Sequence, residues 1–270
     1  MKTLLMLVVA ALTSASCIGQ QVAPNAANET RLLTQLRSSV EEERAKAIEE
    51  LRSKPAVLRG ASVQRALLDL LDRENQALDA ELLQEQNSAQ GGNEDGEDEG
   101  FAEYYSHLVD TVDSFADWND PRQACILVNA SSSPDSDFAA KIAQHAKTTI
   151  PCLIQRTQSP VAMNRSIAVP VLVQALAKQG KNLDSGTIES SKQAIRKGLQ
   201  DSREEVRSFT VSALKSYGDE DMVPMLNEAA KTDPAYSKDA NGYWIRAAAA
   251  EAVTAIQERS RKQKAPENRP

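Results

Sequence analysis

Hydrophobic positions along this chain recur at helical spacing, and one segment shows the pattern clearly. In 206-VRSFTVSAL-214 the residues one, four and seven positions after Arg207 are Ser208, Val211 and Leu214. Positions with this spacing share one face of an α-helix. Because the face combines apolar residues with small ones, the segment predicts a helix that packs closely against a neighbouring helix.

The same pattern occurs three more times, each time aligned on an arginine: 43-ERAKAIEEL-51, 164-NRSIAVPVL-172 and 245-IRAAAAEAV-253. Arg165, Arg207 and Arg246 lie 42 and 39 positions apart, and Arg44 precedes Arg165 by 121 positions. That distance equals about three steps of 40 residues, which indicates an internal repeat. Arg122 lies about two steps after Arg44, and the copy expected near residue 84, in 78-LDAELLQEQ-86, is degenerate.

A first helix is expected before three of these segments, over 30–37, 137–156 and 187–200, with Ser185 as the N-cap of the last. Aromatic residues make up only 4% of the chain, whereas Ala, Leu, Gln, Lys and Glu are frequent, which favours helix throughout. We therefore predict an all-α chain. Its expected architecture is an α-solenoid of about five to six antiparallel helical hairpins, with a period of about 40 residues.

The segment 199-LQDSREEVRSFTVSALKSYG-218 resembles the second-helix signature of the HEAT repeat family. It has the Asp, the Val-Arg pair, the helix rich in small residues, the Ala-Leu pair and the closing Gly of that signature. The resemblance covers 29–258 and is sharpest in the final third. It implies that Asp201 and Arg207 form a ladder of hydrogen bonds linking neighbouring repeats, and that partners bind along the repeat surface.

The other rungs of such a ladder depart from the family pattern. A serine occupies the place of the aspartate before Arg44 and before Arg165, so these rungs would rest on the hydroxyl groups of Ser38 and Ser159. Before Arg246 the nearest acid lies seven positions back rather than six. The expected ladder is therefore complete only at Arg207.

The N-terminal residues 1–19 read as a secretory signal peptide. One Lys precedes an apolar run over 4–12, and small residues follow at 14–16. The run is about half of the roughly 20 residues that span a bilayer, so we expect no transmembrane segment. Cys17, in 14-SASC-17, resembles the lipidated cysteine of a bacterial lipobox, although Ser14 stands where Leu is usual. We expect an exported protein, periplasmic or secreted, with a lipid anchor through Cys17 as the alternative.

The charge distribution predicts two flexible segments and disfavours one class of partner. A net charge of −7 repels phosphate backbones, so nucleic acid is not an expected partner. The run 87–100 has five acids and no large apolar residue, which predicts a flexible loop between repeats at 28–86 and repeats at 101–258. Its acids do not match the spacing of an EF-hand. A flexible basic tail is expected over 259–270.

Cys125 and Cys152 form a candidate disulfide, since an oxidising compartment permits their pairing. Helix geometry argues against the bond. If the turn at 131–136 joins antiparallel helices, Cys125 lies opposite residue 142, and Cys152 lies about 15 Å further along. On this interpretation, only a break at Pro151 brings the two sulfur atoms together.

Two aromatic groups are candidate partner-binding residues, and each group also fits a hydrophobic core. The first contains Tyr104, Tyr105 and Trp118, and follows the acidic run. The second contains Trp244, with Tyr236 and Tyr243 beside it. The sequence leaves both interpretations open.

Nothing in the sequence indicates catalysis or a cofactor. His107 and His145 lack partners at metal-binding spacing, and no nucleophile elbow, phosphate-binding glycine loop or Cys-His signature is present. We expect a non-catalytic scaffold that binds a protein partner in the bacterial cell envelope. The alternatives are an accessory factor that works through the acidic run and the adjacent aromatics, or an enzyme subunit.

Overall fold

The computed structural model of the chain describes residues 26–54, 57, 60–88, 99–239 and 241–264. Within these ranges the regular structure is helical, with twelve α-helices and two short 3-10 helices. The β-type pairing there is a single bridge between Ser237 and Gly242. The prediction of an all-α fold is confirmed.

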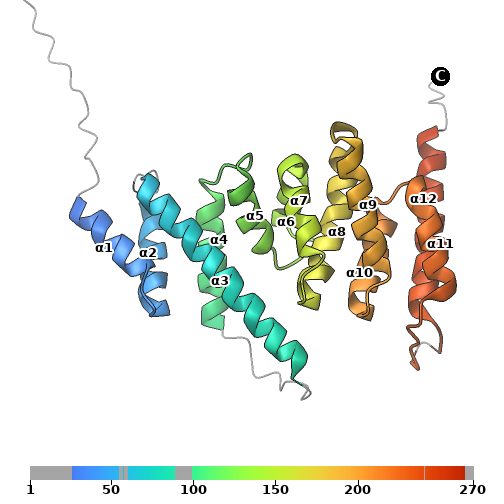
Figure 1. The fold of residues 1–270 in the computed structure, drawn as a ribbon, viewed down its shortest axis with the longest axis horizontal. Coiled ribbons are helices and arrows are strands. Elements are labelled where there is room, and N and C mark those ends of the chain that lie inside the picture. Colours follow the sequence, from blue (N-terminus) through green and yellow to red (C-terminus); the bar gives the residue numbers. More distant parts are fainter. Residues whose placement is uncertain (1–25, 55–56, 58–59, 89–98, 240, 265–270) are drawn as a thin grey trace, which may run out of the picture.

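The helices follow one another in chain order along the long axis of the molecule (Figure 1). Each packs mainly against its neighbours in the row: α8 contacts α6, α7, α9 and α10, and α12 contacts α10 and α11. Their bounds are α1 Ala26–Leu36, α2 Glu41–Ser53, α3 Ala61–Asn87, α4 Glu99–Asp113, α5 Pro121–Asn129, α6 Asp137–Gln144, α7 Ala146–Arg156, α8 Ala162–Gln179, α9 Ser185–Leu199, α10 Glu204–Tyr217, α11 Val223–Thr232 and α12 Trp244–Lys264.

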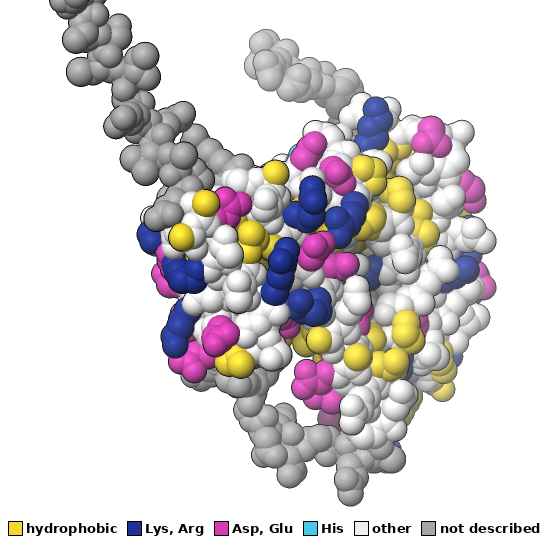
Figure 2. Space-filling model, turned by 60° about the vertical axis from the view of Figure 1, so that its left-hand side comes forward, with side chains coloured by type: hydrophobic (Ala, Val, Ile, Leu, Met, Phe, Trp, Pro, Cys, Tyr) yellow, Lys and Arg dark blue, Asp and Glu magenta, His cyan; other side chains and the backbone are white. Residues whose placement is uncertain are grey.

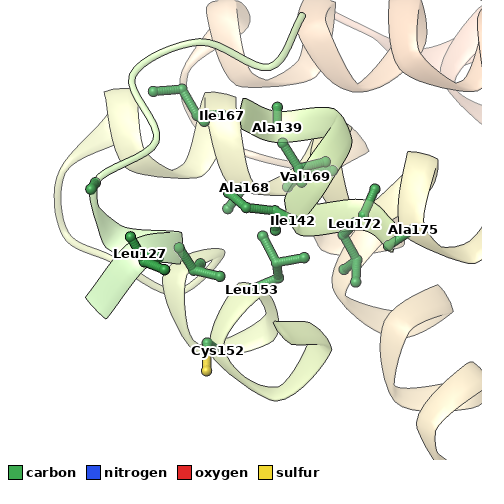
Figure 3. Close-up of a cluster of buried hydrophobic side chains, with 14 of the residues drawn as sticks. Leu127, Ala139, Ile142, Cys152, Leu153, Ile167, Ala168, Val169, Leu172 and Ala175 are labelled. Atoms are coloured by element: carbon green, nitrogen blue, oxygen red, sulfur yellow. The ribbon is translucent and has the colours of Figure 1, made fainter. Parts of the chain in front are cut away.

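The hydrophobic core runs through the row rather than gathering at one centre. In its middle, Leu127 of α5, Ile142 of α6, Leu153 of α7 and Leu172 of α8 meet with at most 1% of their surface exposed (Figure 3). Small residues allow the helices to approach closely. A Cβ atom added at Gly198 of α9 would lie 2.9 Å from side-chain atoms of both α8 and α10.

Helix α3 departs from the expected repeat pattern. It has 27 residues and runs diagonally across the row in Figure 1, contacting α1, α4 and α5. The sequence predicted a degenerate hairpin near residue 84, but α3 continues without a turn to Asn87. The helix contains no Gly or Pro and is rich in Ala, Leu, Gln and Glu, so nothing interrupts it.

The helix predicted over 137–156 is divided into α6 and α7 at His145. Because the chain changes direction there, α5 packs chiefly against α7 rather than α6. Cys125 of α5 and Cys152 of α7 consequently form a disulfide, with their Cα atoms 5.3 Å apart. The predicted separation of about 15 Å is wrong, and the break lies at His145 rather than at Pro151, which is inside α7.

Two predicted boundaries also need correction. The N-cap of α9 is Asp184, whose carboxylate accepts a hydrogen bond from the Thr187 N–H at 2.9 Å, whereas Ser185 is the first helical residue. Residues 259–264 are the last turns of α12 rather than a flexible tail. Arg259 donates to the Gly218 carbonyl at 2.9 Å, and Lys264 lies 2.8 Å from the Glu220 carboxylate, which fixes these turns on the end of α10.

Several predictions fall outside the described residues: the signal peptide with Cys17, the acidic run over 89–98 and the tail over 265–270. Among the helices that the structure describes, none is both long and apolar enough to cross a membrane.

A candidate protein-binding groove

Three of the repeated arginines make the same contact with the backbone. Arg44, Arg165 and Arg207 lie in the first turns of α2, α8 and α10. Each Nη1 donates to the carbonyls six and five residues earlier, at 3.2 and 3.1 Å, 2.9 and 3.1 Å, and 2.8 and 3.3 Å respectively. This contact closes the turn that leads into each helix.

The other side of two of these guanidinium groups binds a carboxylate from further along the chain. Arg165 donates to both oxygens of Asp201 at 2.7 and 2.8 Å. Arg207 does the same to Asp233 at 2.7 and 3.3 Å, with both side chains almost fully buried. Asp201 and Arg207 both take part in this series of contacts, but their side chains do not bind each other. Asp201 gives Arg207 its backbone carbonyl, because its carboxylate is already taken by Arg165.

The ends of this arginine series use other acceptors. The Nε of Arg44 donates to the Tyr104 hydroxyl at 3.0 Å, and Tyr104 in turn donates to Glu74 at 3.1 Å. At the other end, the Nε of Arg246 donates to the Asp233 carbonyl at 2.7 Å, so an acid six positions back is not needed. Arg122 is outside the series, since it is exposed and pairs with Asp69.

The predicted hydroxyl rungs are also corrected. The carbonyls of Ser38 and Ser159, not their hydroxyls, bind Arg44 and Arg165. The two hydroxyls instead accept hydrogen bonds from backbone N–H groups two residues later, at 3.1 and 3.2 Å. A short side-chain oxygen there stabilises the turn itself.

Sequence reasoning missed a buried arginine at the middle of the row. Arg156 of α7 donates to the carbonyls of Val128 and Ser131 and to Asn164 Oδ1, the last two at 2.9 and 3.0 Å. Burial lowers the pKa of Arg156 to about 10, against the attraction of Asp79. Asn164 carries the contact onward to Asp79 of α3 at 2.7 Å. Arg156 lies at the end of a first helix, where the repeat alignment gave no signal.

The first aromatic group belongs to the core. Tyr104 is 4% exposed and Trp118 is 6% exposed, while the hydroxyl of half-buried Tyr105 donates to Asn75. Burial raises the pKa of Tyr104 to about 12 and also raises the pKa of Tyr105. Trp118 stacks on His145 with ring centroids 5.0 Å apart. The interpretation of these three residues as partner-binding anchors is wrong.

Tyr236 and Trp244 of the second aromatic group line a surface groove between α10 and the connection that precedes α12. Phe209, Tyr236 and Trp244 form its apolar lining, and its volume is about 870 Å³. Phe209 and Tyr236 expose 43% and 51% of their surface, and Trp244 is half-buried. We call this feature the aromatic groove.

The connection that carries Tyr236 is held in place by several contacts. Ser237 and Gly242 exchange two backbone hydrogen bonds of 2.9 and 3.1 Å, and Asn241 adopts φ 44° in the turn. Asparagine is among the residues that tolerate this left-handed conformation. The Tyr236 hydroxyl donates to Asn241 Oδ1 at 3.0 Å, and its ring packs edge-on against Tyr243 at 5.3 Å. The exposed ring is therefore pre-positioned.

The rim of the aromatic groove carries charge from the first turn of α10. Glu204 and Glu205 are exposed, and Arg203 lies 3.8 Å from Glu205. Glu204 forms no ion pair with any residue that the structure describes. The rim therefore has an excess of negative charge.

The opposite end of the molecule has a different surface. Turning the N-terminal end forward brings basic and acidic side chains into view side by side (Figure 2). Arg31 and Lys54 both bind Glu50, at 2.6 and 2.7 Å, and their hydrogen bonds lower the pKa of Glu50 to about 2. These charges compensate one another locally.

A metal centre is not apparent in the described part of the chain. There, no three His, Cys, Asp or Glu side chains are grouped so that they could hold an ion. His107 lies 3.7 Å from Glu49, and His145 stacks on Trp118.

The comparisons with known proteins name no family. A scan against protein-family models finds no match, and a search of curated proteins finds none either. Among solved structures, the crystal structure of an engineered protein matches with 17% sequence identity and a TM-score of 0.33. The match covers 86% of this chain and 97% of that chain. A likeness this weak carries no argument about fold or function.

Proposed function

We propose that this protein is a non-catalytic scaffold of the bacterial cell envelope, built as a HEAT-like α-solenoid, that binds a protein partner through the aromatic groove. The observation that carries the proposal is the pair of exposed rings, Phe209 and Tyr236, in an open groove. Exposed aromatic side chains are favoured binding anchors, because they bury a large apolar area and lose little rotamer freedom.

The rigidity of the connection strengthens this argument. The Ser237–Gly242 bridge, the Asn241 turn and the Tyr236–Tyr243 contact order an exposed ring before any partner arrives. Ordering a side chain in advance lowers the entropy that binding must overcome. A surface tyrosine with no partner would gain little from such support.

The repeat interpretation rests on the arginine contacts. Arg44, Arg165 and Arg207 each close the turn before a helix in the same way, and two of them reach forward to a carboxylate of the next helical pair. Such unit-to-unit contacts are what a solenoid needs, since a hairpin alone cannot bury its apolar face.

Export is supported by the disulfide between Cys125 and Cys152, because disulfides persist in oxidising compartments. The alternative function depended on the acidic run, and residues 89–98 of that run lie outside the described part of the chain. The proposal therefore rests on the aromatic groove alone.

Site-specific photocrosslinking in the native envelope tests the proposed function. A photoreactive amino acid at position 209 should give one reproducible protein adduct. The matched control is position 217 at the other end of α10, where Tyr217 is 40% exposed. The adduct should disappear when Tyr236→Ala is added. Equal adducts from both positions, or none from position 209, contradict the proposal.

A further inference from the structure

The linings of the aromatic groove suit an extended ligand rather than a helix. Phe209 comes from α10, Tyr236 from the connection and Trp244 from the start of α12, so flat rings face the groove from three segments. Grooves lined with aromatic rings are a recurrent way to bind proline-rich segments, whose polyproline II conformation exists before binding. A proline ring packs on an aromatic face without losing side-chain freedom.

A hydrogen-bond donor accompanies these rings. The indole Nε1 of half-buried Trp244 makes no hydrogen bond within the described residues and, since it is not one of the buried unpaired atoms, it is open to solvent. Indole N–H groups usually find an acceptor when they are covered. Polyproline II leaves its backbone carbonyls unpaired, so a bound peptide can supply the acceptor.

The rim determines the charge of the ligand. Two aspartates nearby are already neutralised, half-buried Asp201 by Arg165 and buried Asp233 by Arg207. Glu204 and Glu205 are exposed, and only Arg203 compensates them, at 3.8 Å from Glu205. Charge complementarity therefore favours a cation on the ligand beside its prolines.

We infer that the aromatic groove binds an extended, proline-rich segment of a partner protein that carries Lys or Arg next to its prolines. The prolines pack against Phe209 and Tyr236, the Trp244 indole donates to a peptide carbonyl, and the basic side chain lies against Glu204 and Glu205. This inference rests on the proposed function and names the chemistry of its partner.

Fluorescence anisotropy with three labelled peptides of equal length tests the inference. Their repeating units are Pro-Pro-Lys, Ala-Ala-Lys and Pro-Pro-Glu. The Pro-Pro-Lys peptide should bind the wild-type protein at least about tenfold more tightly than either of the others, since aromatic anchors and charge complementarity each contribute on this order. Raising the salt concentration should weaken its binding.

Variants of the protein separate the contributions. Tyr236→Ala and Phe209→Ala should each weaken Pro-Pro-Lys binding about tenfold, whereas Tyr217→Ala, at the far end of α10, should leave it unchanged. Glu204→Lys should weaken Pro-Pro-Lys and strengthen Pro-Pro-Glu. Circular dichroism of each variant verifies that it is folded.

Four outcomes overturn the inference. Equal binding of Pro-Pro-Lys and Ala-Ala-Lys shows that charge alone attracts the peptide, and an unchanged affinity in Tyr236→Ala shows that the peptide binds elsewhere. Sedimentation in which the free protein self-associates, and Tyr236→Ala abolishes the association, assigns the groove to a second copy of this chain. If peptide binding fails while the crosslink from position 209 persists, the inference fails and the proposed function stands. If both fail, the proposed function fails as well.

Discussion

Replacing Arg207 with alanine tests the contact on which the C-terminal part of the row depends. Arg207 is 6% exposed and binds both oxygens of Asp233, which is 4% exposed, together with the carbonyls of Asp201 and Ser202. The alanine variant leaves the Asp233 carboxylate buried without its cation. Breaking a buried ion pair from one side costs about 3–5 kcal/mol. For a chain of this size each kcal/mol corresponds to roughly 2–4 °C, so Tm should fall by about 6–20 °C.

Thermal unfolding followed by far-UV circular dichroism measures this change, and two further variants interpret it. Arg203→Ala removes an exposed arginine one turn earlier, whose ion pair spans 3.8 Å, and should cost less than about 1 kcal/mol. The double variant Arg207→Met with Asp233→Asn leaves no buried charge and should recover part of the lost stability. Hydrogen exchange should quicken in α11 and α12 more than in α7. An Arg207→Ala protein that melts within about 2 °C of the parent refutes this account.

Other structural features give three further predictions. Cys125→Ser should lower the free energy of unfolding by up to about 3.5 kcal/mol, and dithiothreitol should reproduce the loss in the parent but not in the variant, as urea titrations will show. Burial raises the pKa of Asp201, but hydrogen bonds from Arg165 and a backbone N–H outweigh it, so the pKa lies below the usual value of 3.8. The stability that depends on this carboxylate is therefore present above that value and is lost as pH falls through the lowered pKa. Asp201→Asn should be less stable than the parent at neutral pH, and urea unfolding near pH 3 should show a smaller difference. Gly198→Ala places a Cβ 2.9 Å from Val169 and should cost about 1–3 kcal/mol, whereas the control Gly180→Ala, with open space around it, should melt like the parent.

The sequence predicted that the chain is helical and that the recurrent arginines lie at corresponding places in their helices. Both predictions depend on local spacing. Arg44, Arg165 and Arg207 all lie in the first turn of a helix, as the alignment predicted, and they are wholly or largely buried. The partner of Arg207 was not predictable in the same way. The side chain reaches back six residues and meets a carbonyl, which every residue type offers, so the identity of Asp201 says nothing about that contact.

The aromatic residues show a second limit of local reasoning. Tyr104 and Tyr236 both follow polar segments, and composition alone cannot distinguish them. Tyr104 is buried because Arg44 and Glu74, from two other helices, both use its hydroxyl. Tyr236 is exposed because a short hairpin holds it away from α10. The difference comes from tertiary contacts between residues far apart in the sequence.

Helix α3 explains why the period fails in the N-terminal half. Its polar side chains, buried Glu74 and Asn75 and half-buried Asp79, reach α2 through Tyr104, α5 through the Ile126 carbonyl and α8 through Asn164. One long helix thus contacts three successive parts of the row: Glu74 and Asp79 accept hydrogen bonds, whereas the Asn75 amide donates one. For Arg165 and Arg207 the matching acid follows the next helix, 36 and 26 residues further along the chain. For Arg44 the acid comes from α3, the helix that crosses the row. The arginines keep their positions, but the acids that bind them come from different places in the fold. The sequence therefore shows a period in its arginines and none in their acids.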